Sequence, residues 1–234
     1  PSIFLPTTHG TASEVTMWGT IWNMKEEKKY SISHPDLYPS MAILDGNLTL
    51  SLPLDISITT VMDALSHSLE AIWNKNANKT STDFAISAVC SILRNVEALK
   101  QTPSDLSIRN KLLNASTVSG LAFSNTTTAA AHSMSYPLTI HYEIPHGVAS
   151  SIGLIPLLEI NGKLIKEPLD KICNNLELTY NELKQTIKAI PQGVIPYTLK
   201  AWGIPEDQLF GLAGESFTKG RMNNNIVDLK TDDI

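Results

Sequence analysis

The segment VMDALSHSLE, from Val61 to Glu70, constrains this chain most, because it combines a helical pattern with two metal-ligand side chains. Apolar residues recur in and around it at steps of three and four, at Ile58, Met62, Leu65, Leu69 and Ile72. This spacing predicts an amphipathic helix. Asp63 and His67 are four residues apart, so both leave the same face, away from the apolar stripe. Such a pair can share a divalent metal ion, or it can be an ordinary Asp–His hydrogen bond on a helix surface.

Two histidines further along the chain favour the metal interpretation. His132 lies in a run of small residues, and His146 stands between Pro145 and Gly147 at the start of a predicted helix. Each histidine alone is more simply a packed, hydrogen-bonded side chain. Together with Asp63 and His67 they supply one carboxylate and three imidazoles, a set that suits a catalytic divalent ion with room for a substrate oxygen.

The overall composition excludes some classes of function. A net charge of -5 and 18% charged residues argue against nucleic-acid binding. No run of 18 apolar residues is present, so we expect no membrane-spanning helix. Cys90 and Cys173 lie in apolar helical contexts and are predicted to be buried free thiols of a reducing, cytoplasmic compartment.

The order of elements predicts a mainly α protein with a β-rich start. A short buried strand is expected at 3–5, a pair of strands at 16–24 and 30–33 joined by the charged turn 25–29, and a further strand at 41–44. Helices dominate after residue 53, which divides the chain into a β-rich part, 1–53, and a helical part, 54–234. The further helices are expected at 82–99, 105–124, 126–134 (stopping at Pro137), 148–159 (kinked or ended by Pro156), after the capping box at Thr179–Glu182, and at 206–219. Both ends read as interruptions of elements, so we expect a fragment of a longer protein.

The loop that follows the first strand is rich in hydroxyl groups, in the order Thr7-Thr8-His9-Gly10-Thr11-Ala12-Ser13-Glu14-Val15-Thr16. Hydroxyls and exposed N–H groups after a strand suit phosphate and ribose oxygens, although such a run is also typical of an ordinary turn.

This loop, the segment Met62–Glu70, the triplet Phe123-Ser124-Asn125 and the segment from His132 to Gly147 resemble the signatures of the iron-containing (group III) alcohol dehydrogenases. The resemblance implies a dehydroquinate-synthase-like fold, in which 1–53 is the remnant of a Rossmann-like NAD(P)-binding domain and 54–234 is the all-helical metal-binding domain. It implies Asp63, His67, His132 and His146 as ligands of Fe²⁺ or Zn²⁺. It places Thr7, Thr8, Thr16 and Thr20 at the dinucleotide and Phe123 at the substrate pocket. Tyr136 stands where many members have a second histidine, so its hydroxyl is the candidate proton relay, although a pKa near 10 makes it a poor base.

The function implied is a metal-dependent alcohol dehydrogenase or aldehyde reductase that uses NAD or NADP on a short-chain substrate. The segments 72–78 and 133–141 also resemble the phosphonoacetaldehyde-reductase-like branch. The family's glycine-rich diphosphate loop is not in this sequence, so the fragment alone is expected to be inactive, and the full-length enzyme is expected to be a homodimer. His9, in place of a small residue, is expected to face solvent or phosphate.

Two alternatives remain open at this point. One is a dehydroquinate-synthase-like metal-dependent lyase, which would need several Lys and Arg residues near the metal, whereas the segments around Asp63, His132 and His146 contain almost none. The other is a non-catalytic helical interaction domain in which the four ligands are coincidental.

Overall fold

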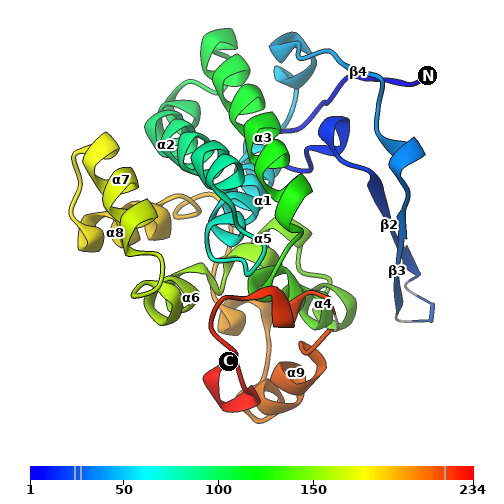
Figure 1. The fold of residues 1–234 in the computed structure, drawn as a ribbon, viewed down its shortest axis with the longest axis vertical. Helices are drawn as coiled ribbons and strands as arrows, with labels where there is room; N and C mark the ends of the chain where they lie inside the picture. Colours follow the sequence, from blue (N-terminus) through cyan, green and yellow to red (C-terminus); the bar gives the residue numbers. More distant parts are fainter. Residues whose placement is uncertain (24, 27, 219) are drawn as a thin grey trace.

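The computed structural model describes residues 1–23, 25–26, 28–218 and 220–234, and it is mainly helical, as predicted (Figure 1). The strands are β1 (Ile3–Phe4), β2 (Trp18–Asn23), β3 (Lys28–Ser33) and β4 (Met41–Ala42). The α-helices are α1 (Leu54–Ile72), α2 (Lys79–Gln101), α3 (Leu106–Thr126), α4 (Ala130–Tyr142), α5 (His146–Ser151), α6 (Leu154–Asn161), α7 (Lys166–Leu176), α8 (Tyr180–Ala189) and α9 (Leu209–Glu215).

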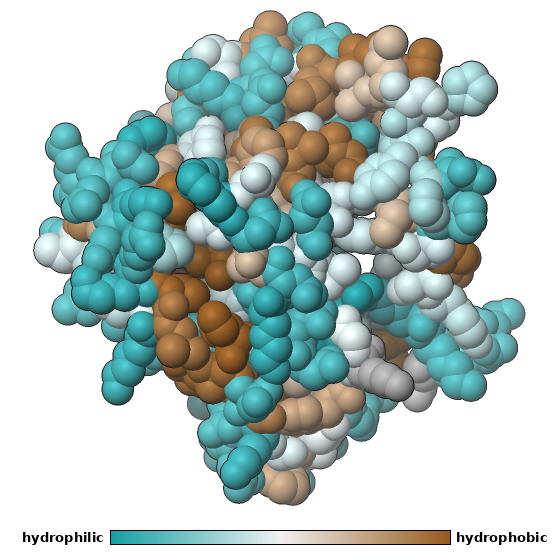
Figure 2. All heavy atoms as spheres, in the orientation of Figure 1, coloured by the Kyte–Doolittle hydropathy of each residue, from teal (hydrophilic) through white to brown (hydrophobic). Residues whose placement is uncertain are grey.

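The first strands form two small pairs. β1 and β4 run parallel, and β2 and β3 form an antiparallel hairpin in which Trp18 pairs with Ser33, which confirms the predicted strand pair. Met24 and Glu27, within the predicted strand end and turn, lie outside the described residues. The predicted burial of 3–5 is wrong, since Ile3 is 57% and Leu5 49% exposed. Apolar atoms are accordingly visible at the top right of the molecule, where Figure 1 shows β4 and the N-terminus (Figure 2).

Helix α1 lies at the centre of the core. It packs against α2, α3 and α5, and from Ser57 onward only one of its residues is not fully buried. The face of α1 that carries Asp63 and His67 is therefore inside the protein rather than at its surface. Ser66 and Ser68 are satisfied within the helix, because each hydroxyl donates at 2.8 Å to a carbonyl four residues earlier.

The small residues of α3 allow the hydroxyl-rich loop to approach it closely. A Cβ atom added at Gly120 would lie 2.4 Å from the Cβ of Ala12 and 2.5 Å from the Cγ2 of Val15. Only glycine permits this contact. It holds the end of the Thr7–Thr16 loop against the helical domain, near the end of α3 that carries Phe123.

Three predicted helix boundaries are wrong. Helix α4 continues through Pro137 to Tyr142, because a proline removes only one helical hydrogen bond and α4 is held by packing on α5 and α9. The predicted helix at 148–159 is broken at Gly153, and Pro156 instead lies in the first turn of α6, where no N–H is needed. Thr126 ends α3 rather than beginning the next helix. In addition, α9 (Leu209–Glu215) is shorter than the helix predicted at 206–219, because residues 206–208 form a 3-10 turn and the helix ends at Glu215. Lys219 itself lies outside the described residues.

Other predictions are confirmed. The Thr179–Glu182 capping box begins α8. Both cysteines are free, although only Cys90 is buried and Cys173 is partly exposed. Within the described residues no single helix is long and apolar enough to cross a membrane; His146–Asn161 with Lys166–Leu176, bent by 117°, meets that criterion only as a pair, by length and composition alone.

Candidate metal centre

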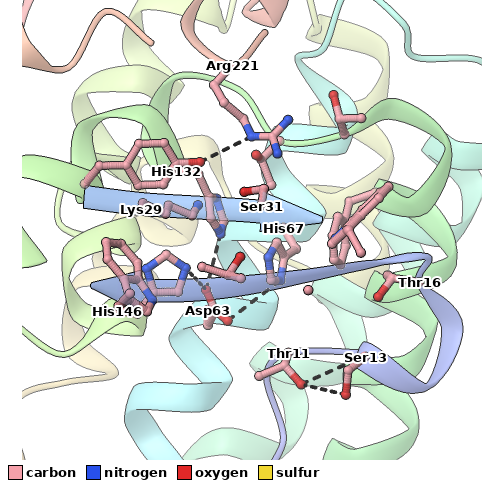
Figure 3. A pocket seen from close by; sticks show the side chains of 18 residues that line it. Thr11, Ser13, Thr16, Lys29, Ser31, Asp63, His67, His132, His146 and Arg221 are labelled. Carbon is pink, nitrogen blue, oxygen red and sulfur yellow. Dashed lines mark hydrogen bonds and ion pairs between the residues drawn. The ribbon is translucent and has the colours of Figure 1, made fainter. Parts of the chain in front are cut away.

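Three of the predicted metal ligands converge from three different helices. Asp63 comes from the middle of α1, His132 from the first turn of α4, and His146 is the first residue of α5 (Figure 3). Asp63 Oδ1 lies 3.3 Å from His132 Nε2 and 3.8 Å from His146 Nε2. One ligand atom from each of the three residues lies within 4.8 Å of the other two.

His67 lies beside this group, and it is farther from Asp63 than the other two histidines are. Its Nδ1 is 4.0 Å from Asp63 Oδ2. Its ring stacks on Phe123 at 3.9 Å and on His132 at 4.4 Å between centroids, with interplanar angles of 8° and 17°. Phe123 therefore fixes the plane of the His67 ring, and His67 faces the same carboxylate as the other two histidines.

The buried nitrogens of this group fit a metal ion. His67 Nδ1 and His132 Nε2, which face Asp63, are buried and have no hydrogen-bond partner among the described residues. The same holds for His146 Nδ1, although the nitrogen of His146 that lies 3.8 Å from Asp63 Oδ1 is Nε2. Each buried polar atom left without a partner costs about 1–3 kcal/mol. An ion bound about 2.1 Å from tetrahedral ligands would place those ligand atoms about 3.4 Å apart, close to the separations found here.

Glu70, one turn after His67 on α1, supports the His132 ring from behind. Glu70 Oε2 lies 2.6 Å from His132 Nδ1, and Oε1 accepts a hydrogen bond from the backbone N–H of His132 at 3.1 Å. A proton on Nδ1 leaves the lone pair of Nε2 directed toward Asp63. Ser150 Oγ donates to Asp63 Oδ1 at 3.1 Å and orients the carboxylate in the same way. The sequence motifs gave Glu70 no role, although its spacing of seven from Asp63 places it on the same face of the helix.

Gly147 allows α5 to reach this centre. A Cβ atom at Gly147 would lie 2.0 Å from the carbonyl oxygen of Thr59 on α1 and 3.2 Å from Asp63 Cβ. The absence of a side chain lets the N-terminus of α5 lie directly against α1, which carries His146 to Asp63.

Three of the four predicted ligands have the charge that a metal ligand requires, and His132 does not. Burial lowers the pKa of His67 to about 3, although Asp63 opposes the shift, and the pKa of His146 is lowered in the same direction. Burial disfavours the Asp63 anion, but the neighbouring histidines outweigh it and hold the pKa of Asp63 below its usual value. At His132 burial is outweighed by Glu70 and Asp63, which raise its pKa. Without a metal, His67 and His146 are therefore neutral and Asp63 is ionised, and a protonated His132 interacts with the carboxylates of both Asp63 and Glu70.

The centre opens into a cavity of about 390 Å³. Thr16, Thr20, Phe123 and Tyr136 line it, together with the four predicted ligands. Thr7 and Thr8 do not line it; Thr7 is exposed and Thr8 half-buried. Trp22, Lys29 and Arg221 also line it and were missed, because they come from the hairpin and from a polar loop more than 85 residues beyond His132.

The sequence matches known families along most of its length. Residues 57–234 match the C-terminal region of the Fe-containing alcohol dehydrogenase family, and residues 1–46 match iron-containing alcohol dehydrogenase. The chain belongs to the iron-containing alcohol dehydrogenase family. The resemblance predicted from the separate motifs is thereby confirmed.

Characterised members of this family align along the chain. It is 31% identical over 233 residues to long-chain-alcohol dehydrogenase 1 of Geobacillus thermodenitrificans (strain NG80-2), covering 95% of this chain and 58% of that protein. It is 37% identical over 168 residues to 1,3-propanediol dehydrogenase of Citrobacter freundii, covering 72% and 43%. The crystal structure of sulfoacetaldehyde reductase from Bifidobacterium kashiwanohense in complex with NAD⁺ superposes with a TM-score of 0.89 at 31% identity, covering 99% of this chain and 62% of that one. The chain thus spans about half the length of the curated relatives it matches.

Within the iron-containing alcohol dehydrogenase framework, two expectations change. His9 is fully buried, and neither ring nitrogen has a hydrogen-bond partner among the described residues, so the side chain does not face solvent. It also does not line the cavity of the metal centre. The shortage of basic residues near the metal holds for the local segments but not for the folded protein, because Lys29 and Arg221 reach the cavity from elsewhere.

Tyr136 lies in the cavity, where burial raises the pKa of its hydroxyl, so it stays protonated near neutrality.

Proposed function

We propose that this chain carries the metal-binding part of an NAD(P)-dependent alcohol dehydrogenase or aldehyde reductase that acts on short-chain substrates. The observation that carries the proposal is the meeting of Asp63, His132 and His146, with His67 beside them, in a cavity that is also lined by Thr16 of the hydroxyl-rich loop and Thr20 of β2. Family membership supports an oxidoreductase, and the names of the relatives support an alcohol or aldehyde substrate.

We assign the metal to Asp63, His67, His132 and His146. Bound there, Fe²⁺ or Zn²⁺ would supply Lewis acidity toward a carbonyl or hydroxyl oxygen while hydride moves to or from the nicotinamide. Equal ligands bind Fe²⁺ less tightly than Zn²⁺, so metal availability decides between them. Glu70 and Ser150 hold the ligands in place, and Trp22 and Phe123 contribute aromatic surface to the cavity wall.

We assign the dinucleotide, NAD or NADP, to Thr7, Thr8 and Thr16 of the hydroxyl-rich loop and to Thr20 of β2, with Phe123 beside the substrate. Because the sequence has no glycine-rich diphosphate loop, residues 1–234 alone are expected to bind the dinucleotide weakly and to turn over poorly. A cytoplasmic homodimer remains our expectation for the full-length enzyme.

The test uses the complete gene product loaded with Fe²⁺ or Zn²⁺. We expect one metal ion per subunit and reduction of propanal with NADH or NADPH. Asp63→Asn, His132→Ala and His146→Ala should each lose metal and activity together. The control is His141→Ala, since His141 pairs with Glu215 at 2.7 Å away from the centre. A metal-free wild type, as expected of an interaction domain, or turnover without net NAD(P)H consumption, as expected of a lyase, would refute the proposal.

A further inference from the structure

Two cationic side chains share the cavity with the metal centre. Lys29 comes from β3 and Arg221 from the polar loop that follows α9. In Figure 3 Arg221 lies at the top of the view, Lys29 and His132 lie below it, and Asp63 and the hydroxyls of Thr11 and Ser13 lie in the lower half. Arg221 is thus at the end of the cavity opposite Asp63, and Lys29 lies between them in this view.

Tyr136 holds both cations in place. Arg221 Nε donates to the Tyr136 hydroxyl at 3.2 Å, and Arg221 Nη1 donates to the Gly220 carbonyl at 3.1 Å. Lys29 Nζ lies 3.7 Å from the centroid of the Tyr136 ring and 5.4 Å from that of Trp22. Cation–π contacts of this kind order a lysine without neutralising it.

Neither cation is neutralised by the part of the protein that the structure describes. No carboxylate there pairs with Lys29 or Arg221, and neither Lys29 Nζ nor Arg221 Nη2 makes a hydrogen bond, whereas several surface lysines have acidic partners. Asp63 is the one acid among the described residues that line the cavity, and it is assigned to the metal. Burial lowers the pKa of Lys29 to about 7, with a further contribution from Arg221, although Asp63 opposes the shift. A bound anion would therefore favour the charged form of Lys29. Such a charge is costly unless a ligand compensates it.

We propose that Arg221, with Lys29 beside it, is the subsite for an anionic group of the substrate, and that the substrate is a short aldehyde or alcohol with a phosphonate, sulfonate or carboxylate at its far end. The inference rests on the proposed reductase function. The planar guanidinium of Arg221, with Nη2 unused, suits the oxygens of such a group. A divalent ion at one side of the cavity and cations at the other would bind the two ends of one small molecule.

The position of Arg221 favours the substrate over the dinucleotide phosphates as its partner. Arg221, Lys29 and Tyr136 also line a second cavity of about 530 Å³. The proposed dinucleotide contacts Thr16 and Thr20 line only the first cavity. Arg221 and Lys29 thus lie where the metal cavity adjoins the second cavity, and Thr16 and Thr20 do not.

The test compares anionic and neutral ligands on the complete, metal-loaded gene product. Calorimetric titration with ethylphosphonate and ethanesulfonate measures binding without turnover, and kcat/KM is measured for phosphonoacetaldehyde, sulfoacetaldehyde, succinic semialdehyde and propanal. We expect binding of at least one anion, and Arg221→Gln should weaken it about 10- to 100-fold, the loss typical of a charged hydrogen bond. The ratio of kcat/KM for the preferred anionic aldehyde over propanal should fall to the same extent, and Arg221→Lys should restore part of it. The most reactive of the three anionic aldehydes identifies the group.

The matched control is Arg94→Gln, because Arg94 is exposed on α2, donates to the Asn175 carbonyl and lines no part of this cavity. Anion binding that Arg221→Gln leaves unchanged, or a rise in the KM for NADPH alone, would overturn the subsite even if propanal is reduced. Loss of anion binding in Arg221→Gln, together with no reduction of any aldehyde, would support the subsite and refute the proposed function instead.

Discussion

Glu70 on α1 accepts the backbone N–H of His132 at 3.1 Å and also lies 2.6 Å from Nδ1 of the same residue. His132 is the third residue of α4, and the residue before that helix, Ala129, offers no side-chain cap. One buried carboxylate therefore caps α4 across the core and sets the orientation of the imidazole. The position of the helix and the direction of its ligand depend on the same side chain.

Replacing Glu70 with Gln should weaken metal binding. The amide keeps the shape of the side chain but loses the charge that orients the His132 ring, so we expect metal affinity to fall about 10- to 100-fold. A chelator competition titration at fixed pH measures it. Glu215→Gln is the matched control, since Glu215 pairs with the partly exposed His141 at 2.7 Å, and it should leave the affinity unchanged. Equal affinities for wild type and Glu70→Gln would contradict this role.

Replacing Gly147 with Ala should force α5 away from α1. The new Cβ would lie 2.0 Å from the Thr59 carbonyl oxygen, and overpacking of this kind costs about 1–3 kcal/mol of unfolding free energy. Metal content should fall as well, because His146 begins the displaced helix. Denaturant unfolding and metal analysis measure both effects. Gly211→Ala in α9, where nothing lies within 4 Å of the added Cβ, should keep or raise stability by up to about 1 kcal/mol; similar losses in both variants would disprove the steric argument.

The pH dependence of stability should contain a term from His9. Burial, with the charge of Arg109, lowers the pKa of His9 from 6.5 to about 4. Between these values the unfolded chain binds a proton that the folded protein does not, so the free energy of unfolding falls as the pH falls from 6.5 to 4. One proton corresponds to about 1.4 kcal/mol per pH unit, or up to about 3 kcal/mol in all.

His9→Phe should remove this term while keeping an aromatic ring in the core. We expect the slope of unfolding free energy against pH between 4 and 6.5 to decrease by about one proton, measured by denaturant titrations in the presence of a chelator. His34→Gln, at a side chain that is 65% exposed, should leave the slope as in the wild type. If His9→Phe does not change the slope, the folded protein protonates His9 as readily as the unfolded chain does, which would contradict the prediction.

Tyr136→Phe separates proton relay from positioning. Burial raises the pKa of the Tyr136 hydroxyl, and that hydroxyl accepts a hydrogen bond from Arg221. We therefore expect a pH–rate profile of unchanged shape and an increase of about 3- to 10-fold in the KM for the preferred anionic aldehyde, because Arg221 loses a partner worth about 1 kcal/mol. A profile that loses its basic limb would instead establish Tyr136 as the relay.

Patterns between residues close in sequence predicted much of this protein. The recurrence of apolar residues identified α1, the strands of the hairpin were recognised on both sides of a charged turn, and Thr179 and Glu182 identified the start of α8. These features depend on contacts within a few residues, so the local sequence contains the necessary information. The same local reasoning failed at Pro137, because the packing of α4 on α5 and α9 keeps the helix intact there. It also failed at Ile3, which the sequence pattern predicts to be buried and which is exposed in the folded protein.

The sequence by itself determined that Asp63 and His67 share a helix face, and the family motifs added His132 and His146 as predicted metal ligands. Only the tertiary structure decided that Glu70 lies behind His132 and that Lys29 and Arg221 line the same cavity. Helical spacing is a property of the backbone over one or two turns, whereas these arrangements bring together residues up to 192 positions apart in the sequence. Their formation depends on how the helices pack around a common core, which no local pattern specifies.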